Sequence, residues 1–233
     1  MKFEDLIYPM TLDEFHTKYH RKKFCVIKGN AWRKNLFTKI ITWEEFSTYI
    51  NNDRAVSGLQ AILPGGKKLC MEKDNLYKHR KPNWSKEFYY EKEYLYRIWR
   101  DNGSIILTKA SLLTKEISAI ASAIEKYFEG AADAHFYCSR AKDGWSFPSH
   151  RDNDDNWLVH AHGTVRWTVN NSLSNLPDDY TEFDLTAGDL LYIPKGLVHK
   201  AVAQTRRISI SVPLIEATEA KPLDRKEYDF SSP

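Results

Sequence analysis

The sequence has few of the residues that mark unusual protein classes. Its 233 residues include only 3 cysteines, 10 glycines and 9 prolines. The cysteines, Cys25, Cys70 and Cys138, are odd in number and far apart, which excludes a disulfide framework and a zinc knuckle. We find no internal repeat or low-complexity tract, so collagen-like, solenoid and disordered classes are excluded as well. What is left is an ordinary globular protein with one sizeable core.

Long apolar runs are also missing. The longest, such as residues 104–108 and 190–193, are far shorter than the ~20 residues that cross a bilayer. The first five residues contain no apolar leader. We therefore predict a cytoplasmic protein without a membrane partner.

Charge is unevenly divided along the chain. Residues 1–100 hold 20 basic against 12 acidic side chains, whereas residues 101–200 hold 9 against 14. A basic first half favours a polyanionic partner such as RNA or a ribosome surface. A solvated helical face explains the same charge equally well.

Helix signals dominate the first part of the chain. Thr11 and Thr42 each precede a glutamate by three residues, which is the capping-box pattern of a helix start. Residues 24–27 predict a short buried strand before a turn. A third helix is predicted from about Ser85 to Trp99.

Strand signals dominate the second part. Residues 104–108 predict a strand, and apolar residues at three- and four-residue spacing between positions 117 and 128 predict a helix that packs on a sheet. From residue 134 onward, turn residues separate seven or eight short strands, a pattern that favours a sandwich or barrel over a parallel sheet.

These signals predict a mostly β fold with flanking helices, built around a jelly-roll barrel. We expect a helix-rich N-terminal support region with edge strands over residues 1–102. The barrel, with the chemistry, is expected over residues 103–215, and a short tail over residues 216–233.

One spacing of polar residues suggests a metal site. His150 and Asp152 are two residues apart, so on a strand they share a face. A second imidazole from His199 on a neighbouring strand would complete a set of two imidazoles and one carboxylate. That set leaves one face of an octahedral ion open, which suits non-haem Fe(II). Chance is the alternative, because short motifs are common in a chain with 8 histidines.

The surroundings of this motif resemble a known family. The segment Gly-Asp-Leu-Leu-Tyr-Ile-Pro-Lys-Gly-Leu-Val-His over residues 188–199 closely resembles the distal-histidine segment of the JmjC-type, cupin-like oxygenases, especially their ribosomal-oxygenase branch. The segment from His150-Arg151-Asp152 through Trp157 to Arg166-Trp167 resembles the proximal segment of the same family. Weaker similarity extends forward, so the resemblance covers most of residues 10–215.

This resemblance implies a dioxygenase that uses Fe(II), 2-oxoglutarate and O₂. It implies that His150, Asp152 and His199 are the catalytic iron ligands. The implied reaction is hydroxylation of a protein side chain, with a ribosomal protein as one candidate, and decarboxylation of 2-oxoglutarate to succinate and CO₂. An RNA (tRNA) hydroxylase of the same branch and a non-catalytic cupin-like metal- or anion-binding module are the alternatives. The oligomeric state is left open.

The sequence departs from the family at the far carboxylate of 2-oxoglutarate. Many relatives place a Lys or Arg where this chain has Val165, and Arg166 should point to the opposite face. On the last strand, alternation leaves Arg207, Ser209 and Ser211 on the interior face. Because Arg-x-Ser resembles the carboxylate-binding pair of other 2-oxoglutarate oxygenases, we nominate Arg207 and Ser209. A solvent-exposed Arg207 at the start of the strand is the alternative.

Further polar residues are candidates for supporting roles. His160 and His162 compete as a metal pair, but the Glu of ordinary cupins is missing after them. We prefer His160 as a group that contacts the cosubstrate or supports its site, with a core histidine as the alternative. Asn156 could donate a hydrogen bond to the metal-binding carboxylate. The family's preceding strand matches Tyr137 and Ser139, which could supply hydroxyls to the cosubstrate.

Two predictions concern the neighbourhood of the motif. Asp154 and Asp155 are predicted to be solvated loop charges rather than an acid–base pair. Trp145 and Trp157 are candidates for the walls of a substrate cleft, with the core as the alternative.

Overall fold

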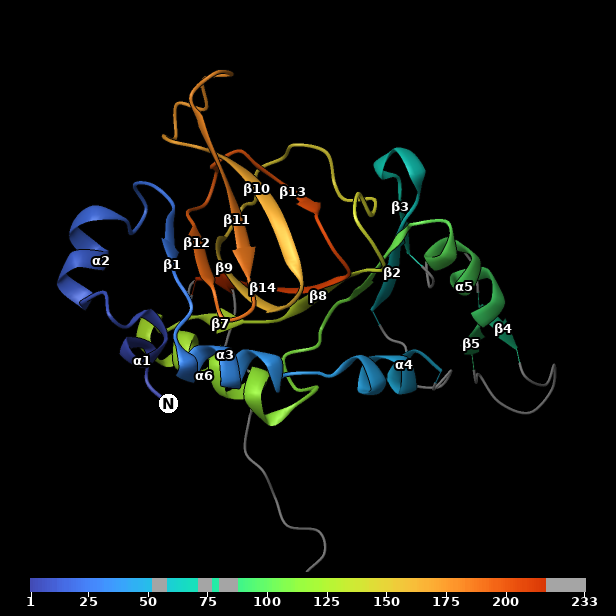
Figure 1. Cartoon of the computed structure of the whole chain (residues 1–233). Helices are drawn as coiled ribbons and strands as arrows, with labels where there is room; N and C mark the ends of the chain where they lie inside the picture. Colours follow the sequence, from blue (N-terminus) through green and yellow to red (C-terminus); the bar gives the residue numbers. More distant parts are fainter. Residues whose placement is uncertain (52–57, 71–76, 80–87, 217–233) are drawn as a thin grey trace, which may run out of the picture.

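The computed structural model describes the chain except for residues 52–57, 71–76, 80–87 and 217–233. Its strands form two facing sheets and a small hairpin, and most of its helices gather on one side (Figure 1). No helix in the described part has the length and apolar content that crossing a membrane requires.

The larger sheet combines strands from both halves of the chain. Its order along the sheet is β1-β12-β9-β14-β8-β6-β2-β3, and β7 pairs separately with β14. These strands are β1 (Cys25–Ile27), β2 (Leu59–Ile62), β3 (Lys68–Cys70), β6 (Ser104–Leu107), β7 (Ala131–Ala132), β8 (His135–Ser139), β9 (Asp155–His162), β12 (Leu190–Ile193) and β14 (Arg207–Ile215). The central pairs are antiparallel.

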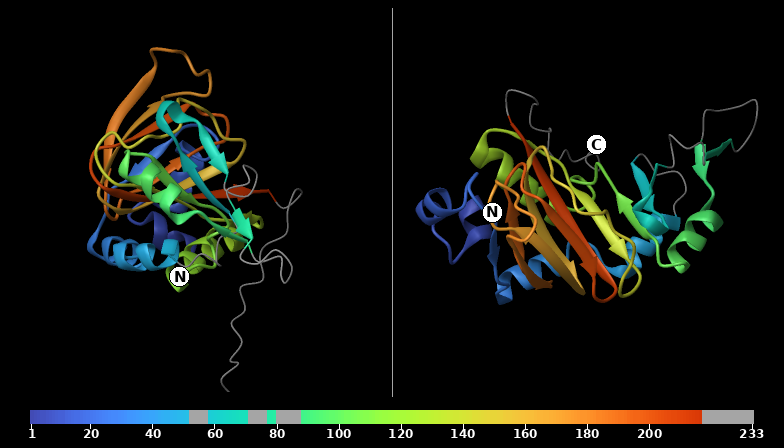
Figure 2. Two further views of the ribbon diagram at one scale, coloured as in Figure 1. Left: turned by 90° about the vertical axis from the view of Figure 1, so that its right-hand side faces the viewer. Right: turned by 90° about the horizontal axis from the view of Figure 1, so that it is seen from above.

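A smaller antiparallel sheet faces the larger one. It is ordered β11-β10-β13, with β10 (Thr164–Asn170) between β11 (Tyr180–Thr186) and β13 (His199–Ala203). From β8 onward the described chain contains seven strands, within the predicted seven or eight. Figure 2 shows the two sheets from two further directions.

Alternation along β14 separates the core from the barrel interior. Ile208, Ile210 and Val212 belong to the main hydrophobic core. Arg207 and Ser209 line the cavity between the sheets, as does Ser211. This is the division that the period of two predicts for a strand with two different faces.

Helices cover the outer face of the larger sheet. They are α1 (Phe3–Ile7), α2 (Leu12–Lys18), α3 (Ala31–Thr38), α4 (Trp43–Asn51), α5 (Lys92–Arg100) and α6 (Lys115–Phe128). Trp157 of β9 is fully buried on this face, with its ring 5.0 Å from Phe3 and 5.2 Å from Phe15. The predicted face of α6 is buried against the sheet, where α6 contacts β7 and β14. Burial of these aromatic and aliphatic side chains stabilises the helical layer.

The predicted helix starts at Thr11 and Thr42 are present. Each threonine Oγ1 accepts a hydrogen bond from the backbone N–H of the glutamate three residues on, both at 3.1 Å. The helix expected from about Ser85 is wrong in its first part. Residues 85–87 lie outside the described range, but Phe88–Tyr90 is strand β5, paired with β4 (Tyr77–His79), and α5 begins only at Lys92. Aromatic residues favour a paired strand there over the helix.

Two buried polar groups connect the N-terminal region to the barrel. Asp189 accepts hydrogen bonds from the backbone N–H of Gly29 at 2.7 Å and of Thr186 at 2.8 Å, and pairs with Lys28 at 3.1 Å. Burial alone would raise its pKa, but these donors hold the pKa of Asp189 below its usual value. Arg33, also buried, donates to the carbonyl of Gly188 at 3.3 Å.

The N-terminal strands are part of the barrel's own sheet. β1 and β3 lie at its two ends, as expected for edge strands, and β2 pairs with β6. The larger sheet therefore runs across the expected boundary at residues 102 and 103. The division into support region, barrel and tail stays a prediction.

Candidate metal centre

The sheets bring His150, Asp152 and His199 together at the end of the barrel. His199 begins β13, and His150 lies in the loop before β9. An isolated bridge joins the two histidines, with the N–H of His150 3.0 Å from the carbonyl of His199 and the reverse bond at 2.8 Å. The backbone itself thus fixes the separation of the two imidazoles.

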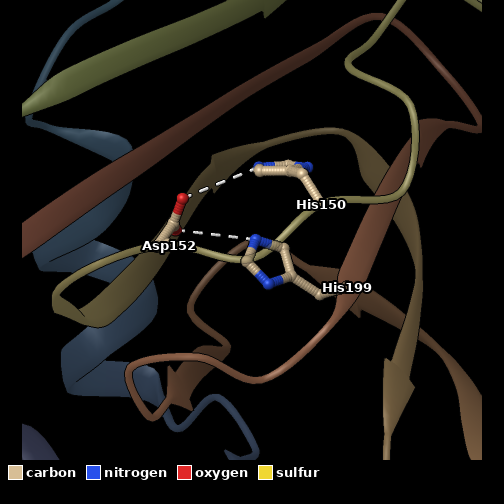
Figure 3. A group of neighbouring side chains, drawn as sticks. All are labelled: His150, Asp152 and His199. Atoms are coloured by element: carbon tan, nitrogen blue, oxygen red, sulfur yellow. Dashed lines mark ion pairs between the residues drawn. The ribbon is translucent and has the colours of Figure 1, made fainter. Parts of the chain in front are cut away.

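The three side chains point at one another (Figure 3). The Nε2 atom of His150 lies 3.7 Å from Oδ1 of Asp152, and Nε2 of His199 lies 3.6 Å from Oδ2. One ligand atom from each residue falls within 4.8 Å of the others, and this is the one such group of three among the described residues. Two imidazole nitrogens and a carboxylate so arranged are a donor set for a divalent transition metal.

Both imidazoles make their backbone hydrogen bonds through Nδ1, which leaves Nε2 available to a metal ion. The Nδ1 atom of His150 lies 2.9 Å from the carbonyl of Pro148, and Nδ1 of His199 lies 2.9 Å from the carbonyl of Leu197. Because a carbonyl only accepts, each Nδ1 carries a proton, so Nε2, which faces Asp152, is the nitrogen that can bind a metal ion. Burial lowers the pKa of His199, which favours its neutral, ligating form.

A short chain of hydrogen bonds holds the carboxylate. Asn156 donates from Nδ2 to Oδ2 of Asp152 at 3.0 Å, and Ser211 donates to Oδ1 of Asn156 at 2.8 Å. Both supporting residues are buried. Such partners orient a ligating carboxylate.

A cavity of about 550 Å³ runs from these three residues into the barrel. Its walls include Arg207, Ser209 and Tyr137, in addition to Trp167 of β10. The indole of Trp167 lies 5.9 Å from the ring of His199. The cavity is thus open to the candidate metal ligands and to a buried cation.

That cation, Arg207, is 3% exposed. Its Nε, Nη1 and Nη2 atoms donate to the hydroxyls of Ser139, Ser209 and Ser146 at 3.2, 3.2 and 3.1 Å. Among the described residues, no Asp or Glu pairs with it. Burial lowers the pKa of Arg207 to about 10, so it stays charged at neutral pH. A buried cation without an acidic partner is suited to an anionic ligand.

Comparison with known proteins agrees with this geometry. Residues 109–221 match the family model described as JmjC domain. Over this segment the chain is similar to a JmjC domain.

Curated relatives match over a longer stretch at low identity. The bifunctional lysine-specific demethylase and histidyl-hydroxylase NO66 of Drosophila grimshawi is 24% identical over 90% of this chain and 29% of that protein. Ribosomal oxygenase 2 of Rattus norvegicus is 24% identical over 85% of this chain and 43% of that protein. The chain therefore spans less than half the length of either relative.

A solved structure shares the fold of this chain. YcfD, a ribosomal oxygenase from Escherichia coli solved in complex with cobalt and 2-oxoglutarate, superposes with a TM-score of 0.61 at 17% identity, covering 93% of this chain and 53% of that one. The predicted jelly-roll fold of the cupin-like type is confirmed.

The structure also shows which cosubstrate candidates face the cavity. Tyr137 lines it, and burial raises the pKa of the Tyr137 hydroxyl to about 12. Ser139 lies behind Arg207 and also contacts Ser104 at 2.8 Å. His160 is 1% exposed and contacts Ser209. Their roles toward a cosubstrate stay predictions.

The departure at Val165 is visible in the structure. Val165 is fully buried in the small sheet's apolar cluster, and Arg166 lies on the outer face, paired with Asp184 at 2.8 Å. The predicted orientation of Arg166 is confirmed. The alternative of an exposed Arg207 is wrong, because β8 and the loop before the motif cover it.

Near the motif, the prediction for Asp155 is wrong, and for Trp157 the core alternative is confirmed. Asp155 is not a solvated loop charge, because it begins β9, is 6% exposed and accepts the N–H of Lys195 at 2.8 Å. Trp157 is in the core behind the sheet, where alternation places it opposite the cavity. Among the cavity residues that the sequence did not indicate is Ser146, which lies in a loop without a periodic pattern. The sequence analysis also did not name Trp167 as a wall residue, although Trp167 shares one face of β10 with Val165 and Val169.

Proposed function

We propose that this protein is an Fe(II)- and 2-oxoglutarate-dependent dioxygenase that hydroxylates a protein side chain. The observation that carries the proposal is a single cavity lined by a two-histidine, one-aspartate donor set and by a buried arginine that has no acidic partner among the described residues. A metal site alone would suit many proteins. Its combination with an anion site in one barrel is what an oxo-dicarboxylate cosubstrate requires.

In this proposal His150, Asp152 and His199 hold the iron. The two imidazoles would bind it through Nε2, and Asn156 keeps the carboxylate of Asp152 turned toward them. A donor set of three protein ligands would hold Fe(II) and leave room for a cosubstrate. The bound iron supplies oxidative chemistry, in which decarboxylation of 2-oxoglutarate to succinate and CO₂ accompanies hydroxylation of the substrate.

Arg207 is the proposed partner of the far carboxylate of 2-oxoglutarate. Ser209 and the Tyr137 hydroxyl are polar groups on the same cavity wall. Arg207 comes from β14, whereas the family's usual basic residue would come from the position of Val165 on β10. Lys68 and Lys109 also line the cavity but are exposed, so with an apolar Val165 the buried cation among its described lining residues is Arg207.

The proposed substrate class is protein, and ribosomal proteins are the first candidates to test. Support comes from the names of two similar proteins, ribosomal oxygenase 2 and the ribosomal oxygenase YcfD. The protein's own contribution is to orient the target C–H bond and limit water access. Trp167 and Leu158 supply apolar wall beside the candidate ligands.

Turnover of 2-oxoglutarate tests the proposal directly. Purified protein with Fe(II) should convert 2-oxoglutarate to succinate, observed by NMR, even without a second substrate. The variants His150→Ala and Asp152→Ala should lose this activity, whereas His162→Ala, whose imidazole bonds to the carbonyl of Ile41 away from the cavity, should keep it. No turnover together with no 2-oxoglutarate binding by calorimetry would refute the proposal.

A second experiment addresses the substrate. Ribosomes and tRNA incubated with the active protein are digested and analysed by mass spectrometry for the mass of one added oxygen atom. Modified ribosomal peptides that are absent with Asp152→Ala support a protein substrate. Modified nucleosides in their place would move the assignment to RNA.

A further inference from the structure

His160 is a buried imidazole that the metal site does not use. It lies on β9 with 1% of its surface exposed. Its two ring nitrogens contact Ser209 and the carbonyl of Gly163. Ser209 lines the cavity, and His160 lies behind it. Any effect of His160 on a ligand must therefore pass through Ser209.

The carbonyl of Gly163 determines the direction of the hydrogen bonds that His160 makes. The oxygen of Gly163, 2.9 Å from Nε2 of His160, can only accept, so Nε2 carries the ring proton. Burial lowers the pKa of His160 to about 4, which leaves the ring neutral at pH 7 with a lone pair on Nδ1. Nδ1 lies 3.0 Å from Oγ of Ser209. Ser209 therefore donates its hydroxyl proton to His160.

This donation determines what Ser209 offers to Arg207. With its proton turned toward His160, the Ser209 oxygen presents lone pairs to Nη1 of Arg207, 3.2 Å away. Ser139 and Ser146 accept from the other two guanidinium nitrogens. Three of the five guanidinium N–H groups are thereby held, and two remain. Two is the number that a bidentate carboxylate accepts.

A break in strand register places His160 opposite Ser209. Ser209 pairs with His160, but Ile208 pairs with His162, so Ala161 is the extra residue of a bulge. Bulges re-aim side chains and are concentrated beside active sites. The backbone here fixes the pair of side chains directly behind Arg207.

We infer that His160 is a positioning residue, which accepts the hydroxyl proton of Ser209 and so holds Arg207 in the orientation that binds the far carboxylate of 2-oxoglutarate. His160 itself does not touch the cosubstrate. The inference rests on the proposed function, since it concerns the same site.

Calorimetry with N-oxalylglycine, a non-reacting analogue of 2-oxoglutarate, tests this on the Mn(II)-loaded protein. His160→Leu removes the acceptor and should weaken N-oxalylglycine binding about 10- to 100-fold, as expected for loss of an outer hydrogen-bonding partner. Affinity for Mn(II) alone should not change, because the metal ligands are untouched. His160→Asn keeps an acceptor near the position of Nδ1 and should restore most of the binding. His162→Leu, two residues on, is the matched control and should bind as the unmodified protein does.

A double-mutant cycle separates positioning from general disruption. If His160 acts through Ser209, then Ser209→Ala should weaken binding by itself, and adding His160→Leu should cause little further loss. Unchanged binding in His160→Leu, equal losses in the Leu and Asn variants, or additive losses in the double variant would each overturn the inference. If the leucine variant fails to fold, wild-type affinity in Ser209→Ala would overturn it. Failure of the unmodified protein to bind N-oxalylglycine would instead overturn the proposed function, and this inference with it.

Discussion

Replacement of Arg207 by methionine separates a ligand-binding cation from a structural one. The side chain is 3% exposed, and its three hydroxyl partners are its hydrogen-bond acceptors among the described residues. A structural arginine would stabilise the ligand-free fold. An anion-binding arginine instead carries a desolvation cost that only the ligand offsets.

The expected effect of Arg207→Met is large on 2-oxoglutarate affinity and small on the stability of the ligand-free protein. Removing one partner of a buried, hydrogen-bonded charge pair costs about 2–5 kcal/mol. This corresponds to a loss of 2-oxoglutarate affinity of about 30-fold or more. In the ligand-free protein each freed hydroxyl keeps another contact: Ser139 with Ser104, Ser209 with His160, and Ser146 with the carbonyl of Gly144. The free energy of unfolding should therefore stay within about 1 kcal/mol of the unmodified value, or rise.

Two measurements check this prediction. Calorimetry with Mn(II) and 2-oxoglutarate gives the affinity, and urea unfolding of the ligand-free protein gives the stability. Arg166→Met, which removes an arginine from the outer face of the barrel, is the matched control for both. Undiminished 2-oxoglutarate binding by Arg207→Met, or a fall of several kcal/mol in ligand-free stability, would refute the reasoning.

Three further predictions concern the metal ligand and the connection to the N-terminal region. Asp152→Asn should abolish Mn(II) binding measured by calorimetry, because the carboxylate is the charged ligand, and retained affinity would contradict the assignment. Asn156→Ala should weaken Mn(II) binding about 10- to 100-fold by releasing Asp152, with His162→Ala as a control that should not. Asp189→Asn should lower the free energy of unfolding at pH 7 by about 1–3 kcal/mol, since buried backbone N–H donors lose a charged acceptor. Because the folded pKa of Asp189 is depressed, its contribution to stability is present above the unfolded pKa and disappears as the pH falls through the folded pKa. Urea unfolding should therefore show a smaller stability difference between Asp189→Asn and the unmodified protein in acid than at pH 7. An undiminished difference in acid would contradict this origin.

Local patterns in the sequence were sufficient for several parts of the structure. The capping threonines Thr11 and Thr42 mark helix starts because they bond to N–H groups within the same turn. The alternation of Ile208, Ile210 and Val212 placed the opposite face of β14 inside the barrel, because the period of a strand is fixed at two. The spacing of His150 and Asp152 indicated the pair, but the strand expected to carry them is wrong, because both residues precede β9. Each of these signals is short in range.

Where long-range contacts compete with local preference, the tertiary structure decided the outcome. Phe88–Tyr90 is a strand because a partner strand is available, and Asp155 is buried because the Lys195 turn supplies an N–H donor. The burial of Arg207 depends on β8 and on the loop that carries Ser146, neither adjacent in sequence. By itself the sequence indicated the fold class, which follows from periodicity, and the candidate ligands, which follow from motif spacing together with the resemblance to the JmjC-type oxygenases. Only the packed barrel decided that Arg207 is buried without an acidic partner in its described surroundings and that His160 stands behind it, because burial is a property of what surrounds a residue.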